Sequence, residues 1–153
     1  MTTGRAAGRT SGTRRRGVLR RAVDGVVTAL VRRGSGPRGT VLLTVAGRTS
    51  GQPRTTPVTL VERDGTRWLV APYGPVGWVA NVRAAGVVDV RRGRAVQRLA
   101  VEEVDAAVGA PVLRQYLQEV AVVRRVFDVA PTDPVEAFVP LVATHPVFRL
   151  RPV

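Results

Sequence analysis

Runs of apolar and β-branched residues recur along the chain from residue 40 onward at the length of short strands. Five such runs predict β-strands, at residues 40–45, 55–62, 67–71, 87–91 and 94–101. Asp64-Gly65 and Arg92-Gly93 fall between neighbouring runs and are typical of tight hairpin turns. Because strands joined by hairpins pair antiparallel, the sequence predicts a mainly antiparallel sheet.

Apolar positions at helical spacing predict helices in four further segments, at residues 14–33, 75–85, 111–123 and 134–142. In the second of these, Pro75 suits the first turn and Gly86 suits the C-terminal cap. A last extended segment covers residues 145–150. This order differs from the strand–helix alternation of a doubly wound sheet. It predicts an α+β fold, mainly antiparallel β: a small curved sheet or barrel with helices on its outside.

Arginine is concentrated ahead of the predicted strands. All 24 basic residues are Arg and none is Lys, and the net charge is +13. Residues 1–38 hold ten Arg and one acidic residue, whereas residues 39–153 hold fourteen Arg and ten acidic residues. We therefore divide the chain into a basic leader, residues 1–38, and one domain, residues 39–153. The lack of Lys indicates a high-GC coding bias, and no groove-reading module is present, so we predict no nucleic-acid partner.

The leader allows two interpretations of its helical segment. Residues 1–13 have the composition of a disordered segment, and Arg residues flank the apolar stripe of residues 14–33. The stripe could lie on an anionic membrane, or it could pack on its own domain. Val and Ala are weak membrane anchors, which favours packing, but peripheral contact stays open.

Sequence features of export and membrane insertion are weak. Arg15-Arg16 resembles a twin-arginine signal, yet Asp24 interrupts the apolar stretch and no small-residue cleavage site follows. No run of eighteen apolar residues occurs, so no helix is expected to span a bilayer. We expect a cytoplasmic protein, with contact at the inner face of the membrane as the open alternative.

The rarity of Cys and His excludes several kinds of site. The chain has no Cys and a single His, His145. A disulfide scaffold, a thiol nucleophile, a Cys-ligated metal and a cluster of His ligands are therefore excluded, and we predict no metal.

Two segments carry residues suited to ligand binding. Residues 47–57 combine two glycines, two Arg and several hydroxyl groups, which suits an anion-binding loop but also an ordinary surface loop. Residues 73–81 place a helix N-terminus after a strand, with Trp78 and Asn81 on adjacent turns of one face. Taken alone, Trp78 could equally be a core residue and Asn81 a helix cap.

Together these segments resemble the deazaflavin (coenzyme F420)-dependent nitroreductase family, also described as F420H2-dependent quinone reductases. The resemblance runs from about Thr40 to Arg94 and resumes at Phe127-Asp128-Val129 and at residues 145–149. The motifs that carry it are Leu42-Leu43-Thr44, Gly47-Arg48-Thr49-Ser50-Gly51-Gln52-Pro53-Arg54, the strand residue Pro57, the turn Asp64-Gly65, and Trp78 with Asn81.

The resemblance implies a split β-barrel, similar to FMN-binding barrels, that holds coenzyme F420. It would place one group of residues around the anionic tail: Arg48, Thr49, Ser50, Gly51 and Arg54. A second group would surround the ring system: Pro57, Val58, Ala71, Tyr73, Trp78 and Asn81. Thr49 stands where the family often has Lys or Arg, and the loop between Ala71 and Trp78 is shorter than in the type member.

The activity implied is transfer of a hydride from the reduced coenzyme to a small acceptor. The acceptor could be a quinone, an enone, a nitro compound or an unsaturated biosynthetic intermediate. Because the cofactor supplies the hydride, the protein has only to position the acceptor and supply a proton. Tyr73 is the candidate proton donor, whereas Tyr116 and His145 are assigned structural roles.

Two other functions stay open at this point. The chain could bind the coenzyme without turnover, or it could be a barrel that has lost the coenzyme and acts as an isomerase, a cyclase or a lipid binder. The sequence also leaves the oligomeric state open, a dimer included.

Overall fold

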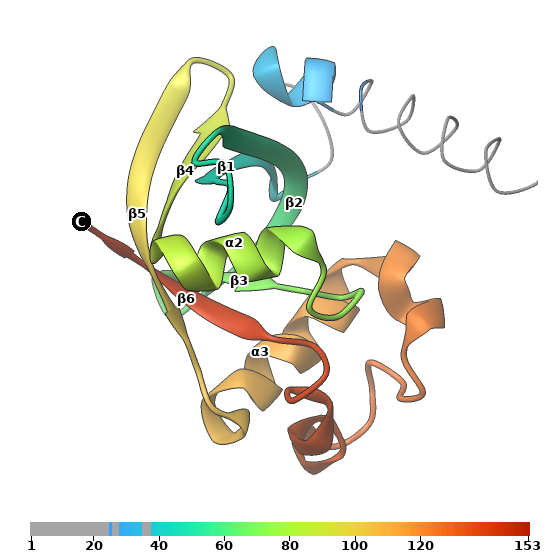
Figure 1. The fold of residues 1–153 in the computed structure, drawn as a ribbon. Coiled ribbons are helices and arrows are strands. Elements are labelled where there is room, and N and C mark those ends of the chain that lie inside the picture. The colour runs from blue at the N-terminus through green and yellow to red at the C-terminus, as the bar shows by residue number, and fades with distance from the viewer. Residues whose placement is uncertain (1–24, 26–27, 35–37) are drawn as a thin grey trace, which may run out of the picture.

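Six strands form a closed antiparallel barrel in the order β1-β2-β3-β6-β5-β4 (Figure 1). The computed structural model describes residue 25, residues 28–34 and residues 38–153. The strands are β1 (Thr40–Ala46), β2 (Pro53–Arg63), β3 (Thr66–Val70), β4 (Val87–Arg92), β5 (Ala95–Glu103) and β6 (Val147–Pro152). The predicted α+β, mainly antiparallel barrel is confirmed.

The turns of the barrel follow the sequence signals that predicted them. Asp64 and Gly65 join β2 to β3 with φ angles of 51° and 72°, and Gly93 joins β4 to β5 with φ of 59°. These left-handed conformations cost little for Gly and are tolerated by Asp. They set the register in which Leu60 faces Leu69 and Arg91 faces Val96.

Helix α2 (Gly77–Ala85) connects β3 to β4 and packs against β1 and β4 (Figure 1). Gly86 caps its C-terminus with φ of 70°, as predicted, and its N–H donates to the Val82 carbonyl at 2.9 Å. The helix begins at Gly77 and not at Pro75. The reason is that Val76 keeps an extended backbone, with ψ of 176°.

Helix α3 (Ala106–Glu119) corrects the predicted helix 111–123 at both ends. Asp105 caps its N-terminus by accepting from the Val108 N–H at 3.0 Å, a stronger start signal than Pro111. Pro111 lies inside the helix, where its missing N–H removes one backbone bond. The chain then forms the 3-10 helices η1 (Ala121–Val126) and η2 (Val135–Leu141), so the segment predicted at 134–142 is not α-helical.

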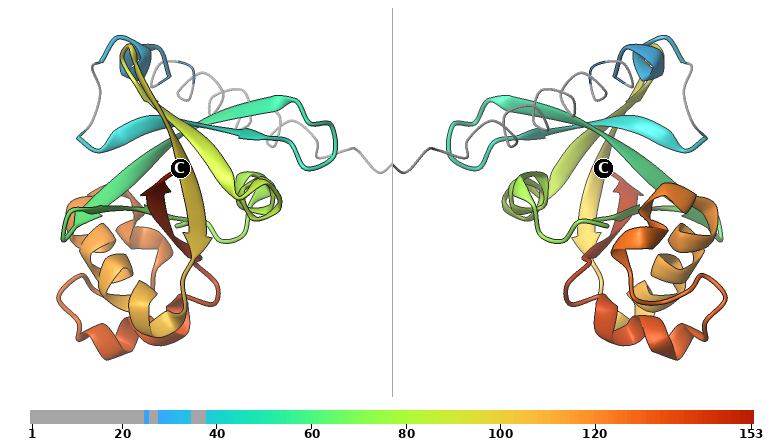
Figure 2. Two further views of the ribbon diagram at one scale, coloured as in Figure 1. Left: turned by 90° about the vertical axis from the view of Figure 1, so that its left-hand side faces the viewer. Right: turned by 90° about the vertical axis from the view of Figure 1, so that its right-hand side faces the viewer.

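The barrel supports two hydrophobic cores. The first fills its interior with residues such as Leu43, Leu69 and Phe148. The second lies between the outer face of β3 and α3 with its following 3-10 helices, and includes Trp68 and Phe138. Figure 2 shows these helical segments gathered against one side of the barrel, away from the β1–β2 hairpin.

The end of the leader packs on the barrel. Residues 28–32 are helical, and Val31 is fully buried. Its carbonyl accepts from the Gly93 N–H at 2.8 Å. The described end of the predicted helix 14–33 therefore packs on the domain. Residues 1–24 lie outside the described residues. Within the described residues no helix is long and apolar enough to cross a membrane. The boundary between leader and domain at residue 38 stays a prediction.

Candidate functional site

The β1–β2 loop, which carries the predicted anion-binding residues, is a closed turn. The Gly47 N–H donates to the Gln52 carbonyl at 2.8 Å, and the Gly51 N–H donates to the Gly47 carbonyl at 2.8 Å. A Cβ added at Gly47 would meet the Ser50 hydroxyl oxygen at 3.0 Å and the Gln52 carbonyl at 3.3 Å. A side chain at residue 47 would therefore be crowded against the loop in this closed form.

Arg48 ties this loop to α2. Its backbone N–H and its Nη1 both donate to Asn81 Oδ1, at 3.1 Å and 2.9 Å, and Nη1 also lies 3.4 Å from the Gly77 carbonyl. Asn81 is buried, and its two bonds to Arg48 are partly buried. Within the described residues no carboxylate pairs with Arg48, and its positive charge stays available to an anion.

The remaining predicted residues of the loop face solvent. Thr49, Ser50, Gly51 and Arg54 are all exposed, and Ser50 Oγ accepts from the Gln52 N–H at 3.2 Å. The side chains of Thr49 and Arg54 make no hydrogen bond or ion pair with any residue in the described part of the chain. The loop thus presents one tethered and one free guanidinium group.

An apolar pocket of about 230 Å³ lies between β2, the β3–α2 connection and the α3–η1 segment. Four of the predicted ring-contacting residues line it: Pro57, Val58, Tyr73 and Trp78. Its remaining lining residues are Thr40, Thr59, Val70, Pro72, Tyr116, Val120, Val122 and Val123.

Two predicted ring contacts lie elsewhere. Ala71 is 1% exposed and belongs to the core inside the barrel. Asn81 uses its side chain on Arg48 and does not line the pocket. Ala71 ends up inside because side chains alternate along the extended chain, which places Val70 on the pocket side and Ala71 on the core side.

The pocket contains a pair of tyrosines that differ sharply in exposure. Tyr73 is 56% exposed, whereas Tyr116 is 3% exposed. Burial raises the pKa of Tyr116 above its ordinary value, and the neighbouring Tyr73 raises it further. Tyr116 therefore keeps its proton at neutral pH.

Tyr116 and the η1 valines are among the pocket residues that sequence reasoning missed. Tyr116 lies among the apolar residues of α3. Its phenol hydroxyl is the one feature of that residue that could have suggested a role in a binding pocket. Val122 and Val123 follow the end of α3, in the segment that was predicted as helix. Only the packing of α3 on the barrel brings these residues to Tyr73.

His145 contacts the chain segment next to Tyr73. Its Nδ1 lies 3.0 Å from the Pro72 carbonyl, and its ring packs on Phe127 at a centroid distance of 4.4 Å. Both contacts fit the structural role predicted for His145. Because Pro72 precedes Tyr73, His145 helps to position the tyrosine.

Helix α2 joins the loop to the pocket. Trp78 lines the pocket and Asn81 holds Arg48, one helical turn further on. This arrangement suits a ligand with a flat apolar body and an anionic extension, with the body against Trp78 and the extension at the loop. Within the described residues no group of three His, Cys, Asp or Glu side chains could hold a metal ion.

Comparison with known sequences gives one family. A family model described as F420H(2)-dependent quinone reductase matches residues 18–128, well over half of the chain. A search of the curated proteins gives no match.

Solved structures share the fold at low sequence identity. One, titled a domain-swapped dimer, has a TM-score of 0.55 and 22% identity, covering 91% of this chain and 98% of its own. Another, titled F420-H2 dependent reductase (FDR-A), has a TM-score of 0.54 and 23% identity, covering 76% and 96%. A putative pyridoxamine 5′-phosphate oxidase from Listeria innocua has a TM-score of 0.53 and 12% identity, covering 85% and 93%.

Proposed function

Because the chain belongs to the F420H2-dependent quinone reductase family, and is thus a reductase that depends on this coenzyme, we propose that it reduces a small electrophilic acceptor. The acceptor classes are a quinone, an enone, a nitro compound or an unsaturated biosynthetic intermediate. The observation that carries the proposal is the apolar pocket beside Trp78, which α2 links to the Arg48 loop.

The residues of the site fit both parts of the coenzyme. F420 has a flat deazaflavin ring and an anionic phosphate and glutamate tail. We propose that Pro57, Val58 and Trp78 hold the ring, while Arg48 and Arg54 bind the tail. Guanidinium groups suit phosphate and carboxylate, and charge-assisted hydrogen bonds are the strong ones. The hydrogen bonds to Asn81 hold Arg48 at the loop.

When bound, the reduced coenzyme supplies a hydride to the acceptor. The chain's own residues then have to exclude water, hold the acceptor and supply the matching proton. The η1 valines and Trp78 give the pocket apolar walls. Tyr73 opens to solvent and can regain a proton after each turnover, so we assign it the proton donation. Tyr116 keeps its proton and acts as a fixed donor that orients an acceptor oxygen.

Isotope transfer tests this function directly. F420H2 deuterated at C5 on the transferred face is mixed with the protein and menadione, p-nitrobenzoate or cyclohexenone in parallel. We expect deuterium on the reduced carbon of cyclohexenone. For the quinone and the nitro compound, whose product O–H and N–H groups exchange with water, we expect stoichiometric loss of label from the coenzyme with product formation. Coenzyme binding without oxidation by any acceptor would instead support a carrier. FMN in place of F420 is the control and should bind more weakly, because it lacks the glutamate tail.

Assembly and location are further proposals. The structure titled a domain-swapped dimer supports dimerisation as a proposal for this chain. We also propose that the protein is cytoplasmic. Peripheral contact of residues 14–33 with the membrane is the alternative that stays open.

A further inference from the structure

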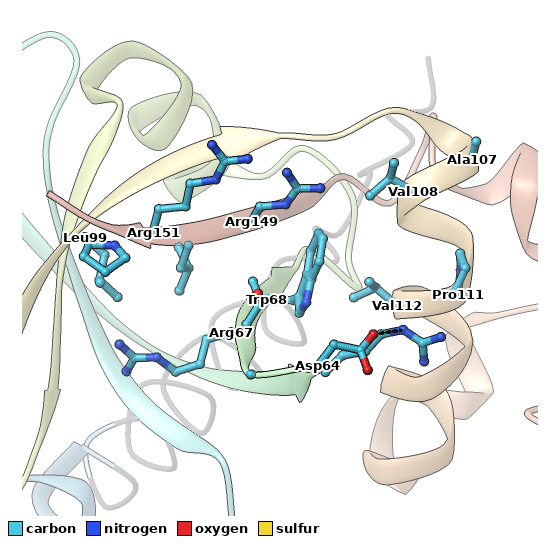
Figure 3. Close-up of a pocket in the computed structure, with 15 residues that line it drawn as sticks. Asp64, Arg67, Trp68, Leu99, Ala107, Val108, Pro111, Val112, Arg149 and Arg151 are labelled. Atoms are coloured by element: carbon cyan, nitrogen blue, oxygen red, sulfur yellow. Dashed lines mark ion pairs between the residues drawn. The ribbon is translucent and has the colours of Figure 1, made fainter.

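A second pocket, separate from the proposed coenzyme site, lies beside the first turns of α3 (Figure 3). Its volume is about 530 Å³, and it opens between the β2–β3 turn, β6 and the first turns of α3. It shares no residue with the pocket around Trp78. Trp68 stands at its centre in Figure 3, with Arg149 and Arg151 on one side and Arg67 on the other.

This pocket holds more positive charge than its neighbours neutralise. Its four guanidinium groups belong to Arg63, Arg67, Arg149 and Arg151. Two carboxylates face them: Asp64 lies 3.9 Å from Arg63, and Glu102 lies 3.7 Å from Arg149 and 2.9 Å from Arg151. Among the described residues Arg67 has the neutral amide of Gln97 as its hydrogen-bond partner, and it lies opposite Glu62 in the β2–β3 register. With Glu62 counted beside Asp64 and Glu102, the four arginines keep an excess of one positive charge.

The floor of the pocket is apolar and contains an unsatisfied donor. Trp68 is 7% exposed, and its indole Nε1 is buried without a hydrogen-bond partner among the described residues. The Arg149 guanidinium lies 5.1 Å from the centre of the Trp68 ring, as in a cation–π contact. Val112 and Leu150 complete the floor. Arginine side chains thus surround a surface that favours hydrocarbon.

We propose that this pocket binds a small organic anion, with a carboxylate or phosphate between the arginines and an apolar body against Trp68 and Val112. A positive rim selects the charged head, because Arg binds carboxylate and phosphate through paired hydrogen bonds. The apolar floor selects against fully hydrated inorganic anions. The site is independent of the proposed reductase function.

Fluorine NMR tests the site with the full chain, because Trp68 and Trp78 are the two tryptophans and each reports on a different pocket. Protein labelled with 5-fluorotryptophan gives two resonances, which Trp78→Phe assigns. Octanoate, octyl phosphate and 1-octanol are the probes. We expect octanoate or octyl phosphate to shift the Trp68 resonance to saturation, with neutral 1-octanol at least tenfold weaker. The stronger of the two anions identifies the head group.

Charge-removing variants give the second measurement. Arg149→Gln and Arg67→Gln should each weaken anion binding about tenfold and leave 1-octanol unchanged. Arg94→Gln, an exposed arginine in the β4–β5 turn, is the matched control and should bind as wild type does. Arg67→Gln keeps the test decisive if Arg149→Gln fails to fold, because Arg67 pairs with no carboxylate among the described residues.

Three results would overturn the proposal. The first is a shift of the Trp78 resonance alone, which would place the anion in the coenzyme pocket. The second is equal affinity for octanoate and 1-octanol. The third is a Trp68 shift that follows protein concentration without any probe, which would make this face a contact between two copies of the chain.

Discussion

The side-chain oxygen of Asn81 accepts two hydrogen bonds from one residue, Arg48, at 3.1 Å from the backbone nitrogen and 2.9 Å from Nη1. A buried amide on α2 thereby fixes both the backbone of the β1–β2 loop and the direction of its guanidinium group. The same helix carries Trp78 into the apolar pocket. The distance between the two parts of the proposed coenzyme site is therefore set by one rigid element.

Replacing Asn81 by Asp keeps the hydrogen-bond acceptor at this position but adds a negative charge beside Arg48. A carboxylate oxygen can accept the same two hydrogen bonds, so the loop should stay in place. Its negative charge would neutralise Arg48 and repel the anionic tail of F420. We expect F420 affinity to fall roughly tenfold or more, since about 1.4 kcal/mol corresponds to each factor of ten. Calorimetric titration with F420 measures this.

Asn81→Ala is the matched control for that change. It leaves the Arg48 N–H without its partner, which typically costs about 1–3 kcal/mol of stability. We expect a lower free energy of unfolding in urea for Asn81→Ala than for Asn81→Asp. If Asn81→Asp binds F420 as wild type does, the tail does not reach Arg48.

Arg54→Ala should weaken F420 binding roughly tenfold or more, because a charge-assisted hydrogen bond contributes about 1.5–3 kcal/mol. The Arg54 side chain is exposed and has no partner within the described residues, so its loss should leave the melting temperature unchanged. Arg94→Ala, also exposed but remote from the loop, controls for the general loss of positive charge.

At the neighbouring residue Thr49, a positive charge can be added to the loop instead of removed. Thr49→Lys adds a cation at the loop and should tighten F420 binding, more strongly at low salt than at high salt. Unchanged affinity for both Arg54→Ala and Thr49→Lys would show that the tail runs along another surface.

Tyr73→Phe should lower turnover while leaving F420 affinity nearly intact. The ring stays in place, and only the proton donor is lost, which for general acid catalysis typically costs a factor of about 10²–10⁴. Steady-state oxidation of F420H2 with menadione measures this. Tyr116→Phe should mainly raise KM, because that hydroxyl is proposed to orient the acceptor. A Tyr73→Phe enzyme with full turnover would make solvent the proton source.

Tyr116 should also make the free energy of unfolding depend on pH in the alkaline range. Its pKa is raised in the folded state, whereas in the unfolded chain the phenol titrates near its ordinary value of about 10. Above that value the unfolded state loses the proton first, so the free energy of unfolding falls as pH rises. Below about pH 9 the effect is absent. Urea unfolding between pH 8 and 11 should show this decline in wild type and a smaller one in Tyr116→Phe.

Removal of residues 1–33 should destabilise the domain. The truncation deletes Val31, which is fully buried against the barrel, and the carbonyl that accepts from Gly93. Burying a Val side chain contributes about 1.5–3 kcal/mol, so the melting temperature should fall measurably. Removal of residues 1–24 alone should leave it unchanged.

The same two truncations test contact with a membrane. Co-sedimentation with phosphatidylglycerol vesicles should decrease with added salt for the full chain and be lost in both truncations. Binding that both truncations retain would move the contact to the barrel. No binding by the full chain at low salt would exclude the membrane interpretation.

Most of the barrel could be predicted from the sequence, because each strand ends at a local signal. Asp64-Gly65, Gly86 and Gly93 occupy left-handed positions that few other residues adopt without cost. The helix α3 starts earlier than predicted because Asp105 satisfies a backbone donor at its N-terminus, while Pro111, a residue typical of a first turn, lies inside the helix. The 3-10 segments carry Pro140 and short apolar runs that periodicity does not separate from α-helix.

The candidate site was predictable only as far as its local parts. The loop at Arg48 and the helix at Trp78 have recognisable sequences, and the structure connects them through the hydrogen bonds between Arg48 and Asn81. The place of Tyr116 in the pocket could not be predicted, because its position near Tyr73 depends on how α3 packs on the barrel. The arginine pocket around Trp68 collects residues from three separate segments, and no single segment signals it.

The closing seam of the barrel has a consequence for how the chain folds. β3 pairs with β6, so that Trp68 faces Arg149 across more than half of the chain's length. The hairpins β1–β2–β3 and β4–β5 need only short loops, whereas this seam requires a long loop to be closed first, which slows folding. We expect the hairpins to form early and the seam to form last. Weakening the Trp68–Arg149 contact should then speed unfolding while the folding rate changes little.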